Sequence, residues 1–169
     1  GAITTSDAAL AARVKRLRNG GQTDRYHHAE LGVNSRLDEI QAAILSARLP
    51  YLARWTSARR EVAGQYRRLL AGAPVDVPPE CDSGHVYHLL PILSPSRDRL
   101  QAWLHDLGIE TLIHYPVPIP RQPALASEHP NVCPVADRVC SRILSVPLYP
   151  GIPESEVEQV VNAIFRFTP

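Results

Sequence analysis

Histidine is the residue type in this chain best suited to chemistry, because an imidazole can bind a metal, move a proton or donate a hydrogen bond. The chain has seven. His85 and His88 stand three apart in a segment with strand character, where an odd separation places side chains on opposite faces. His27 and His28 are adjacent and have the same geometry. The sequence contains no set of three or four potential metal ligands at a recognisable spacing, so we expect no metal site.

Other common catalytic patterns are also missing from the sequence. There is no Gly-x-Ser-x-Gly segment. Cys81, Cys133 and Cys140 form no C-x-x-C pair, which argues against a zinc site or a disulfide framework and favours a reducing, cytoplasmic setting. Gly20-Gly21 does not continue into a phosphate-binding loop, and its simpler interpretation is the end of a helix.

The residues that remain indicate binding rather than a defined reaction. Tyr26, His28, Asn34 and Arg36 surround a loop that enters a predicted helix. Polar side chains on such loops commonly form binding sites, and arginine and asparagine at a helix start can hold an anion. The alternative is that Asn34 and Ser35 only cap the helix.

Two predicted elements flank this first cluster. Residues 1–5 have the character of a strand end, and Ser6 or Asp7 is expected to cap a helix that stops at Asn19-Gly20-Gly21. Residues 22–33 are predicted to form a polar loop. Apolar side chains at helical spacing give the helix an apolar stripe: Leu10, Val14 and Leu17.

A long helical stretch is predicted next. Residues 35–38 have the pattern of a capping box, and the helical spacing continues past Pro50 to Gly72. We expect one long kinked helix or two nearly collinear helices. Its first apolar face is formed by Leu37, Ile40, Ile44 and Leu45.

The remainder of the chain alternates between strand and helix patterns, which predicts a small α/β sandwich. The expected strands span 85–93, 109–115 and 143–148, and the expected helices run from Ser96 to Gly108, around 135–140, and over 154–165. The second of these strands ends at His114-Tyr115, directly before a loop rich in proline.

Composition narrows the class of protein. A length of 169 residues fits one domain or two, and a net charge of +1 gives no reason to expect a nucleic-acid partner, although arginines are dense along the long helix. No apolar run approaches the roughly 20 residues of a membrane span, so we expect no membrane partner. The chain has no methionine, and its single lysine is Lys15. We therefore expect another segment before Gly1.

Five segments of the chain form an ordered set of motifs: residues 1–5 (GAITT), 17–21 (LRNGG), 32–45 (GVNSRLDEIQAAIL), 114–118 (HYPVP) and 145–150 (SVPLYP). With these motifs, the sequence resembles the DegT/DnrJ/StrS family of nucleotide-sugar aminotransferases over essentially its whole length.

This resemblance implies the C-terminal part of a fold type I, aspartate-aminotransferase-like enzyme that depends on pyridoxal phosphate. Residues 1–45 would be the tail of the large cofactor domain, 46–72 the connecting helix and 73–169 the small domain. Such enzymes move an amino group, usually from glutamate, to a nucleotide-linked keto-sugar. The family's Schiff-base lysine would lie just upstream of Gly1, and Lys15, inside a helix, is not its equivalent.

Individual site residues follow from the same resemblance. Asn34 would reach the cofactor phosphate of the neighbouring subunit in a homodimer, and Arg36 would support that contact or bind a substrate anion. The sugar nucleotide would be lined by Tyr26, His28, His114, Tyr115 and Gln122. Family members with this His-Tyr-Pro-x-Pro loop commonly have histidine where Pro120 stands. The loop most resembles members that act on 3-keto sugars joined to thymidine diphosphate.

Two other interpretations remain at this stage. The chain could be a non-catalytic assembly module, such as a truncated homologue, or a small unrelated binding domain whose motif matches are coincidental. Under the family interpretation, the chain by itself is expected not to transaminate because the lysine is missing.

Overall fold

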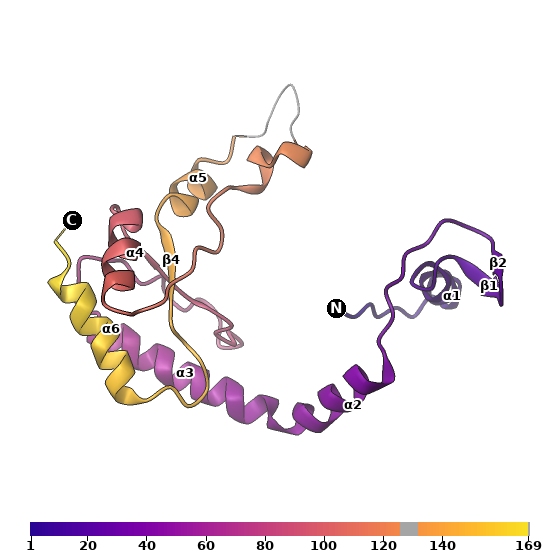
Figure 1. The fold of residues 1–169 in the computed structure, drawn as a ribbon, viewed down its shortest axis with the longest axis horizontal. Helices are drawn as coiled ribbons and strands as arrows, with labels where there is room; N and C mark the ends of the chain where they lie inside the picture. Colours follow the sequence, from indigo (N-terminus) through magenta and orange to yellow (C-terminus); the bar gives the residue numbers. More distant parts are fainter. Residues whose placement is uncertain (126–131, 169) are drawn as a thin grey trace. The chain divides into compact units, whose positions relative to one another are not determined.

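The computed structural model describes residues 1–125 and 132–168. It divides into two compact units, Gly1–Pro50 and Tyr51–Pro169, whose elements are labelled in Figure 1. The finer division predicted from the sequence, at residues 45/46 and 72/73, stays a prediction. None of the helices in the described residues is long and apolar enough to cross a membrane.

Helix α1 (Ala8–Leu17) begins where the sequence indicates. The Asp7 carboxylate accepts hydrogen bonds from the amides of Ala9 at 2.8 Å and Leu10 at 3.1 Å, which satisfies two donors that have no partner inside the helix. The predicted strand end at 1–5 is wrong. These residues pair with no strand in the described part of the chain, and extended backbone without a partner forms no ladder.

A short hairpin replaces the predicted loop at its start. Strands β1 (Gln22–Asp24) and β2 (His27–His28) pair antiparallel, and the two-residue connection places Tyr26 at φ +73°. A positive φ is common in tight hairpin turns but rare for tyrosine. The hairpin therefore presents Tyr26 at its tip.

The next helix starts later than expected. Helix α2 spans Glu39–Arg48, and its N-cap, Asp38, makes no side-chain cap bond, so the predicted capping box at 35–38 is wrong. The amide of Ser35 instead donates to the carbonyl of Arg18 at 2.8 Å, and this bond holds the segment in extended form. A 3₁₀ turn, Leu49–Tyr51, contains Pro50 and separates α2 from α3 (Leu52–Leu69).

The second unit contains a two-stranded antiparallel sheet of β3 (Leu90–Leu93) and β4 (Ile143–Val146), with Leu90 opposite Val146 and Leu93 opposite Ile143. One isolated bridge flanks each strand: Asp76 pairs with Leu93, and Leu112 pairs with Ser145. The predicted strand at 109–115 is thus reduced to a bridge.

The strand predicted at 85–93 is correct only in its second half. Tyr87 has φ +46°, outside the β region, and its amide donates to the ring Nδ1 of His85 at 3.1 Å. The Asp82 carboxylate likewise accepts the amide of Gly84 at 2.8 Å. Side chains occupy donors that a ladder would need, so neither His85 nor His88 lies in a strand and the argument about opposite faces does not apply.

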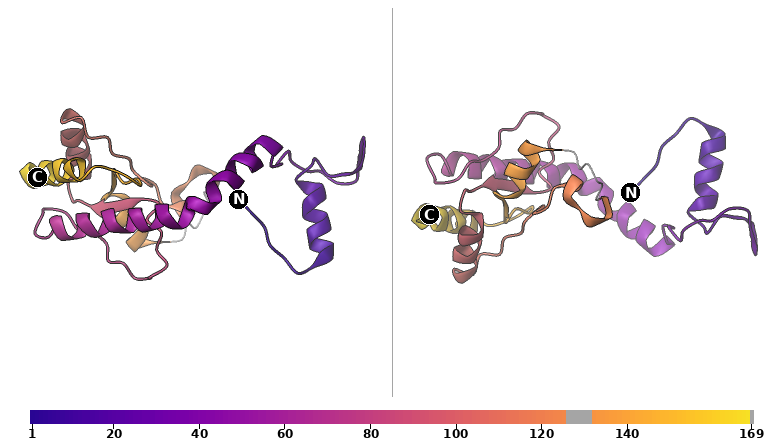
Figure 2. Two further views of the ribbon diagram at one scale, coloured as in Figure 1. Left: turned by 90° about the horizontal axis from the view of Figure 1, so that it is seen from below. Right: turned by 90° about the horizontal axis from the view of Figure 1, so that it is seen from above.

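The helices that follow α3 in the second unit lie where the sequence places them. They are α4 (Arg97–Asp106), α5 (Pro134–Cys140) and α6 (Glu154–Arg166), with short 3₁₀ turns at Ile119–Arg121 and Pro123–Leu125. Helix α6 contacts both α3 and α4, as the two views of Figure 2 show. Acidic residues in its first turn and Arg166 in its last complement the helix dipole.

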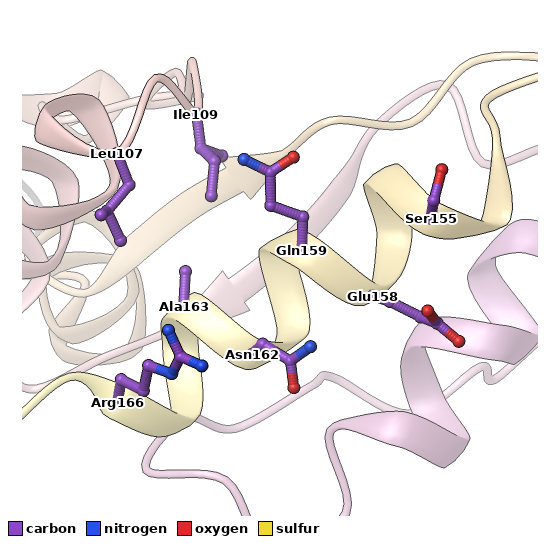
Figure 3. Close-up of a pocket in the computed structure, with 8 residues that line it drawn as sticks. All are labelled: Leu107, Ile109, Ser155, Glu158, Gln159, Asn162, Ala163 and Arg166. Atoms are coloured by element: carbon purple, nitrogen blue, oxygen red, sulfur yellow. The ribbon is translucent and has the colours of Figure 1, made fainter.

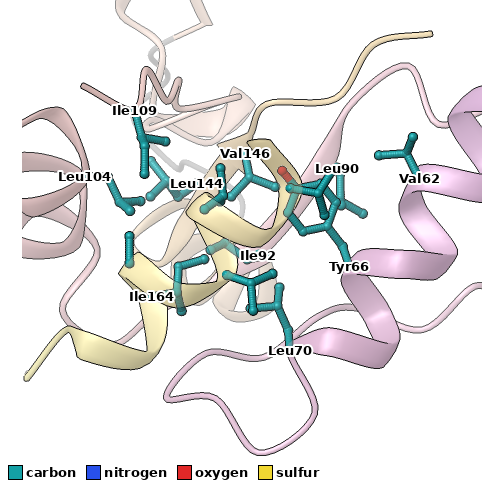
Figure 4. Packing of buried hydrophobic residues seen from close by; sticks show 14 of the residues in the cluster. Val62, Tyr66, Leu70, Leu90, Ile92, Leu104, Ile109, Leu144, Val146 and Ile164 are labelled. Atoms are coloured by element: carbon teal, nitrogen blue, oxygen red, sulfur yellow. The ribbon is translucent and has the colours of Figure 1, made fainter. Parts of the chain in front are cut away.

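The hydrophobic core lies within this unit, between the sheet and α3, α4 and α6 (Figure 4). The predicted stripe of α6 is confirmed, since Val157, Val160, Val161 and Ile164 are buried at spacings of three and four. Other side chains with no more than 1% exposure include Tyr66, Leu90, Ile92, Leu100, Leu104 and Leu144.

Candidate functional site

The first predicted cluster lies where two chain segments cross. The amide of Gly20 donates to the carbonyl of Val33 at 2.9 Å, and the amide of Val33 donates to that of Leu17 at 2.8 Å. A Cβ on Gly21 would lie 1.7 Å from the carbonyl oxygen of Glu30, and one on Gly32 would lie 2.2 Å from the amide nitrogen of Gly21. Only glycine fits at this crossing.

Glu30 ties the crossing to helix α1. Its carboxylate accepts from Arg13 Nε at 3.1 Å and from Arg16 Nη2 at 3.2 Å. The hydrogen bond from Arg13 is the main cause that lowers the pKa of Glu30 below the usual carboxyl value, with Arg16 adding to it against partial desolvation. Glu30 is therefore a charged anchor at neutral pH.

Asn34 and Arg36 form a pair on the exposed end of this crossing. Arg36 Nε donates to Asn34 Oδ1 at 3.1 Å, and Asn34 is held by its bridge to Asn19. Both residues are exposed. The terminal guanidinium nitrogens of Arg36 and the amide nitrogen of Asn34 bond to none of the described residues. These donors could hold a phosphate or carboxylate.

Tyr26 and His28 behave differently from each other. Tyr26 is 76% exposed, with the guanidinium of Arg25 5.0 Å from its ring centroid. His28 turns back, because its Nδ1 donates to the carbonyl of Gly20 at 2.7 Å, and its Nε2 lies 3.5 Å from Gln22 Nε2. His28 thus braces the hairpin against the crossing, while Tyr26 is available to a ligand.

A histidine–aspartate contact that we did not anticipate lies beside them. The Nδ1 of His27 contacts the Asp24 carboxylate across the hairpin turn. The sequence carries a signal for this pair, an aspartate three residues before a histidine around a two-residue turn, but that signal depends on recognising the hairpin.

The second predicted cluster belongs to the other unit. His114 is half-buried, and its Nδ1 lies 3.0 Å from the hydroxyl of Ser145 on β4. Tyr115 is 70% exposed, with its ring edge-on to His114 at 5.6 Å between centroids. Gln122 is exposed and donates to the carbonyl of Val117 at 3.4 Å. We did not anticipate Ser145 as a partner of His114 from the sequence.

The structure therefore brings the predicted residues together in two groups, one in each unit. Lys15 is exposed in the last turn of α1. A cavity of about 390 Å³ in the second unit is lined by α6 side chains with Leu107 and Ile109 (Figure 3), and it includes none of the predicted site residues. Among residues 1–125 and 132–168, no group of three or more His, Cys, Asp or Glu could hold a metal.

Comparison with known proteins defines the class. Residues 1–165 match the model of the DegT/DnrJ/EryC1/StrS aminotransferase family, and the chain belongs to this family. A solved structure of S. venezuelae DesV in complex with a ketimine intermediate superimposes with a TM-score of 0.86 at 36% identity, covering 98% of this chain and 47% of that one. The predicted α/β fold class, the C-terminal part of this kind of enzyme, is confirmed.

Two curated relatives align along nearly the whole chain. The pleiotropic regulatory protein of Geobacillus stearothermophilus is 42% identical over 99% of this chain and 46% of its own length. The dTDP-3-amino-3,6-dideoxy-alpha-D-galactopyranose transaminase of Aneurinibacillus thermoaerophilus is 40% identical over 99% and 46%. The chain thus spans about half the length of the curated relatives it matches.

The family is one of enzymes that depend on pyridoxal phosphate. One structural neighbour, NtdA of Bacillus subtilis, has the cofactor PMP bound; it is 26% identical with a TM-score of 0.79, covering 96% of this chain and 40% of that one. The exposed Asn34–Arg36 pair fits such a group, because its donors match the oxygen atoms of a phosphate.

Proposed function

We propose that this chain is the C-terminal portion of an aminotransferase that moves an amino group from glutamate to a nucleotide-linked keto-sugar. The observation that carries the proposal is the family match over residues 1–165, together with a relative named as a sugar transaminase that aligns over 99% of the chain. That relative also argues against the non-catalytic assembly module. The division into a cofactor-domain tail (1–45), a connecting helix (46–72) and a small domain (73–169) is part of this proposal.

Pyridoxal phosphate is the proposed cofactor. When bound, it supplies the carbonyl chemistry that makes an amino group transferable. Asn34 would donate its amide hydrogens to the phosphate, and Arg36, whose Nε fixes the Asn34 oxygen, would add charge. The Schiff-base lysine is proposed to lie outside this chain, because Lys15 is exposed in the last turn of α1.

We also propose a cytoplasmic location, which suits a soluble biosynthetic enzyme. The proposed assembly is a homodimer with shared sites. In this dimer, Asn34, Tyr26 and His28 would serve the neighbouring subunit's site. The exposed apolar side chains of α2 support this proposal, because an apolar surface of this kind is typically covered by a partner: Ile40 is 72% exposed, Ile44 53% and Leu45 57%.

The keto-sugar would contact His114, Tyr115 and Gln122. Tyr115, exposed and edge-on to His114, offers an aromatic face to a sugar ring. The relative that acts on a dTDP-linked 3-amino sugar supports a 3-keto-6-deoxyhexose on thymidine diphosphate as the first substrate to test.

A chimera tests this proposal. The portion of the A. thermoaerophilus enzyme that precedes the matched region is fused to Gly1 of this chain, and the chimera is assayed with L-glutamate and dTDP-3-keto-6-deoxyhexose. We expect a visible absorption band from bound pyridoxal phosphate and formation of 2-oxoglutarate and the amino-sugar nucleotide. The 169-residue chain alone should show neither.

Variants of the chimera test the site assignment. Asn34→Ala and Arg36→Ala should each weaken cofactor retention about tenfold, the value of one charge-assisted hydrogen bond. A folded chimera that holds the cofactor but aminates no keto-sugar nucleotide contradicts the proposal, as does a visible band from the chain alone.

A further inference from the structure

Ser145 is a polar residue at an aliphatic position. It lies in β4 between Leu144 and Val146 and is 5% exposed. Its backbone is held on both sides: Pro91 stands opposite it in β3, and on the other side its amide donates to the carbonyl of Leu112 at 2.7 Å. The backbone of Ser145, and with it the direction of its Cα–Cβ bond, is therefore set by the sheet.

This hydroxyl has one partner among the described residues, the Nδ1 of His114 at 3.0 Å. A buried hydroxyl hydrogen without an acceptor costs free energy. If Nδ1 carried the imidazole proton, Nδ1 would donate to Ser145 and leave the hydroxyl hydrogen without an acceptor. If the hydroxyl donates to Nδ1, the Ser145 donor is satisfied and the imidazole proton is on Nε2.

The second assignment leaves a donor in a useful place. The Nε2 of His114 hydrogen-bonds to none of the residues that the structure describes, and the exposed Tyr115 ring stands edge-on beside it. A neutral imidazole with its proton on Nε2 can donate to a hydroxyl or keto oxygen.

We propose that Ser145 is a positioning residue: it donates to His114 Nδ1, fixes the ring and its tautomer, and so presents Nε2–H to an oxygen of the keto-sugar. The role of the sugar in this inference rests on the function proposed above. The hydrogen bond and the tautomer do not, since both are properties of the chain itself.

Nitrogen NMR of the full chain, labelled with ¹⁵N-histidine, measures the tautomer directly. At about pH 8, where imidazoles are neutral, wild-type His114 should show one tautomer, with the proton on Nε2. His114→Gln assigns the signal. Ser145→Ala should give a mixture of both tautomers, and Ser145→Thr, which retains the hydroxyl, should restore the single form.

Ser94→Ala is the matched control. Ser94 is also buried, at 0% exposure, directly after β3, and its hydroxyl accepts the amide of Ser96 instead of contacting His114. It should lower the thermal unfolding temperature as Ser145→Ala does but leave the His114 signal unchanged. A proton on Nδ1 in the wild type, or an unchanged His114 signal in folded Ser145→Ala, overturns the inference.

Kinetics of the chimera separate the two proposals. Ser145→Ala should raise KM for the keto-sugar about tenfold, the loss expected for one hydrogen bond, and leave KM for glutamate unchanged. An inactive parent chimera counts against the proposed function only, since the NMR result stands by itself. If the parent chimera is active and Ser145→Ala changes neither KM value, Ser145 has no role in binding the keto-sugar.

Discussion

At the residue scale, the crossing at Gly21 and Gly32 matters most for the first cluster. It lets two backbone segments approach more closely than any side chain permits, and it joins the hairpin that carries Tyr26 and His28 to the segment that carries Asn34. Gly21 is also the one buried residue among residues 1–50, all of which the structure describes. Backbone geometry, rather than side-chain packing, holds this cluster together.

We predict that Gly21→Ala breaks the crossing. A methyl group there would overlap the Glu30 carbonyl, and φ +78° costs a non-glycine residue about 1–2 kcal/mol before any overlap is counted. In a ¹H–¹⁵N spectrum, the amides of Val33 and Ser35 should move to random-coil positions.

Gly20→Ala is the matched control. Gly20 has a similar φ of +70°, but the nearest atoms to a new Cβ belong to the His28 ring at 3.5 Å, an ordinary contact. This variant should lose only the free energy that a positive φ costs a non-glycine residue, and the amide signals of Val33 and Ser35 should stay in place. Equal effects of the two substitutions would contradict the role assigned to close approach.

At the scale of elements, the segment before β3 shows how side chains replace a strand. Tyr87 is 2% exposed, its hydroxyl donates to the Glu80 carboxylate, and Arg60 donates to the same carboxylate at 2.6 Å. The Tyr87 hydrogen bond, followed by Arg60, holds the pKa of Glu80 below the usual carboxyl value. The segment is thereby fastened to α3 instead of extending the sheet.

Helix α4 is held in place by its buried side, and we predict that Leu104→Ala destabilises the second unit by about 2–5 kcal/mol, the usual cost of such a cavity. Leu104 is 0% exposed in the core. Urea unfolding followed by the fluorescence of Trp55 and Trp103, both in the second unit, measures this change in the free energy of unfolding.

Leu107→Ala provides the comparison, because Leu107 follows the same helix but is 42% exposed. It should cost less than about 1 kcal/mol. A similar loss in both variants would show that α4 does not depend on the buried contact.

At the scale of the whole molecule, the two units differ in what stabilises them. Every buried hydrophobic side chain in the described residues lies between Val62 and Phe167, and residues 1–50 contribute none. The first unit is held by backbone hydrogen bonds and by the ion pairs of Glu30. Such regions open locally at low free-energy cost.

Hydrogen exchange tests this difference. In dilute chain, we predict that amides of α1 and α2 exchange at least about 100-fold faster than those of β3, β4 and α6, because opening them exposes little apolar surface. Mass spectrometry of peptides after deuterium labelling gives the rates. Strong protection of α2 at low concentration would contradict the prediction, and protection that appears only at high concentration would show that another copy covers it.

Local chemistry made much of this structure predictable. The sequence narrows the cap of α1 to Ser6 or Asp7, and the buried stripe of α6 follows from its aliphatic residues at helical spacing, since both features depend on neighbours within a few residues. The start of α2 could not be predicted in this way, because it depends on a hydrogen bond from the Ser35 amide to the carbonyl of Arg18, which is distant in the sequence. The prediction of a strand at 85–89 is wrong for a similar reason, because Tyr87 contacts Arg67 on α3 and Glu80.

The ordered motifs from residues 1 to 150 were sufficient to indicate the family and the fold class, because a motif records which residue types a site needs. The single lysine, Lys15, was equally visible in the sequence. The tertiary structure decided which atoms meet: Nδ1 of His114 with the Ser145 hydroxyl, and Nδ1 of His28 with the Gly20 carbonyl. Hydrogen bonds depend on distance and direction within a few tenths of an ångström, and only the folded backbone sets these.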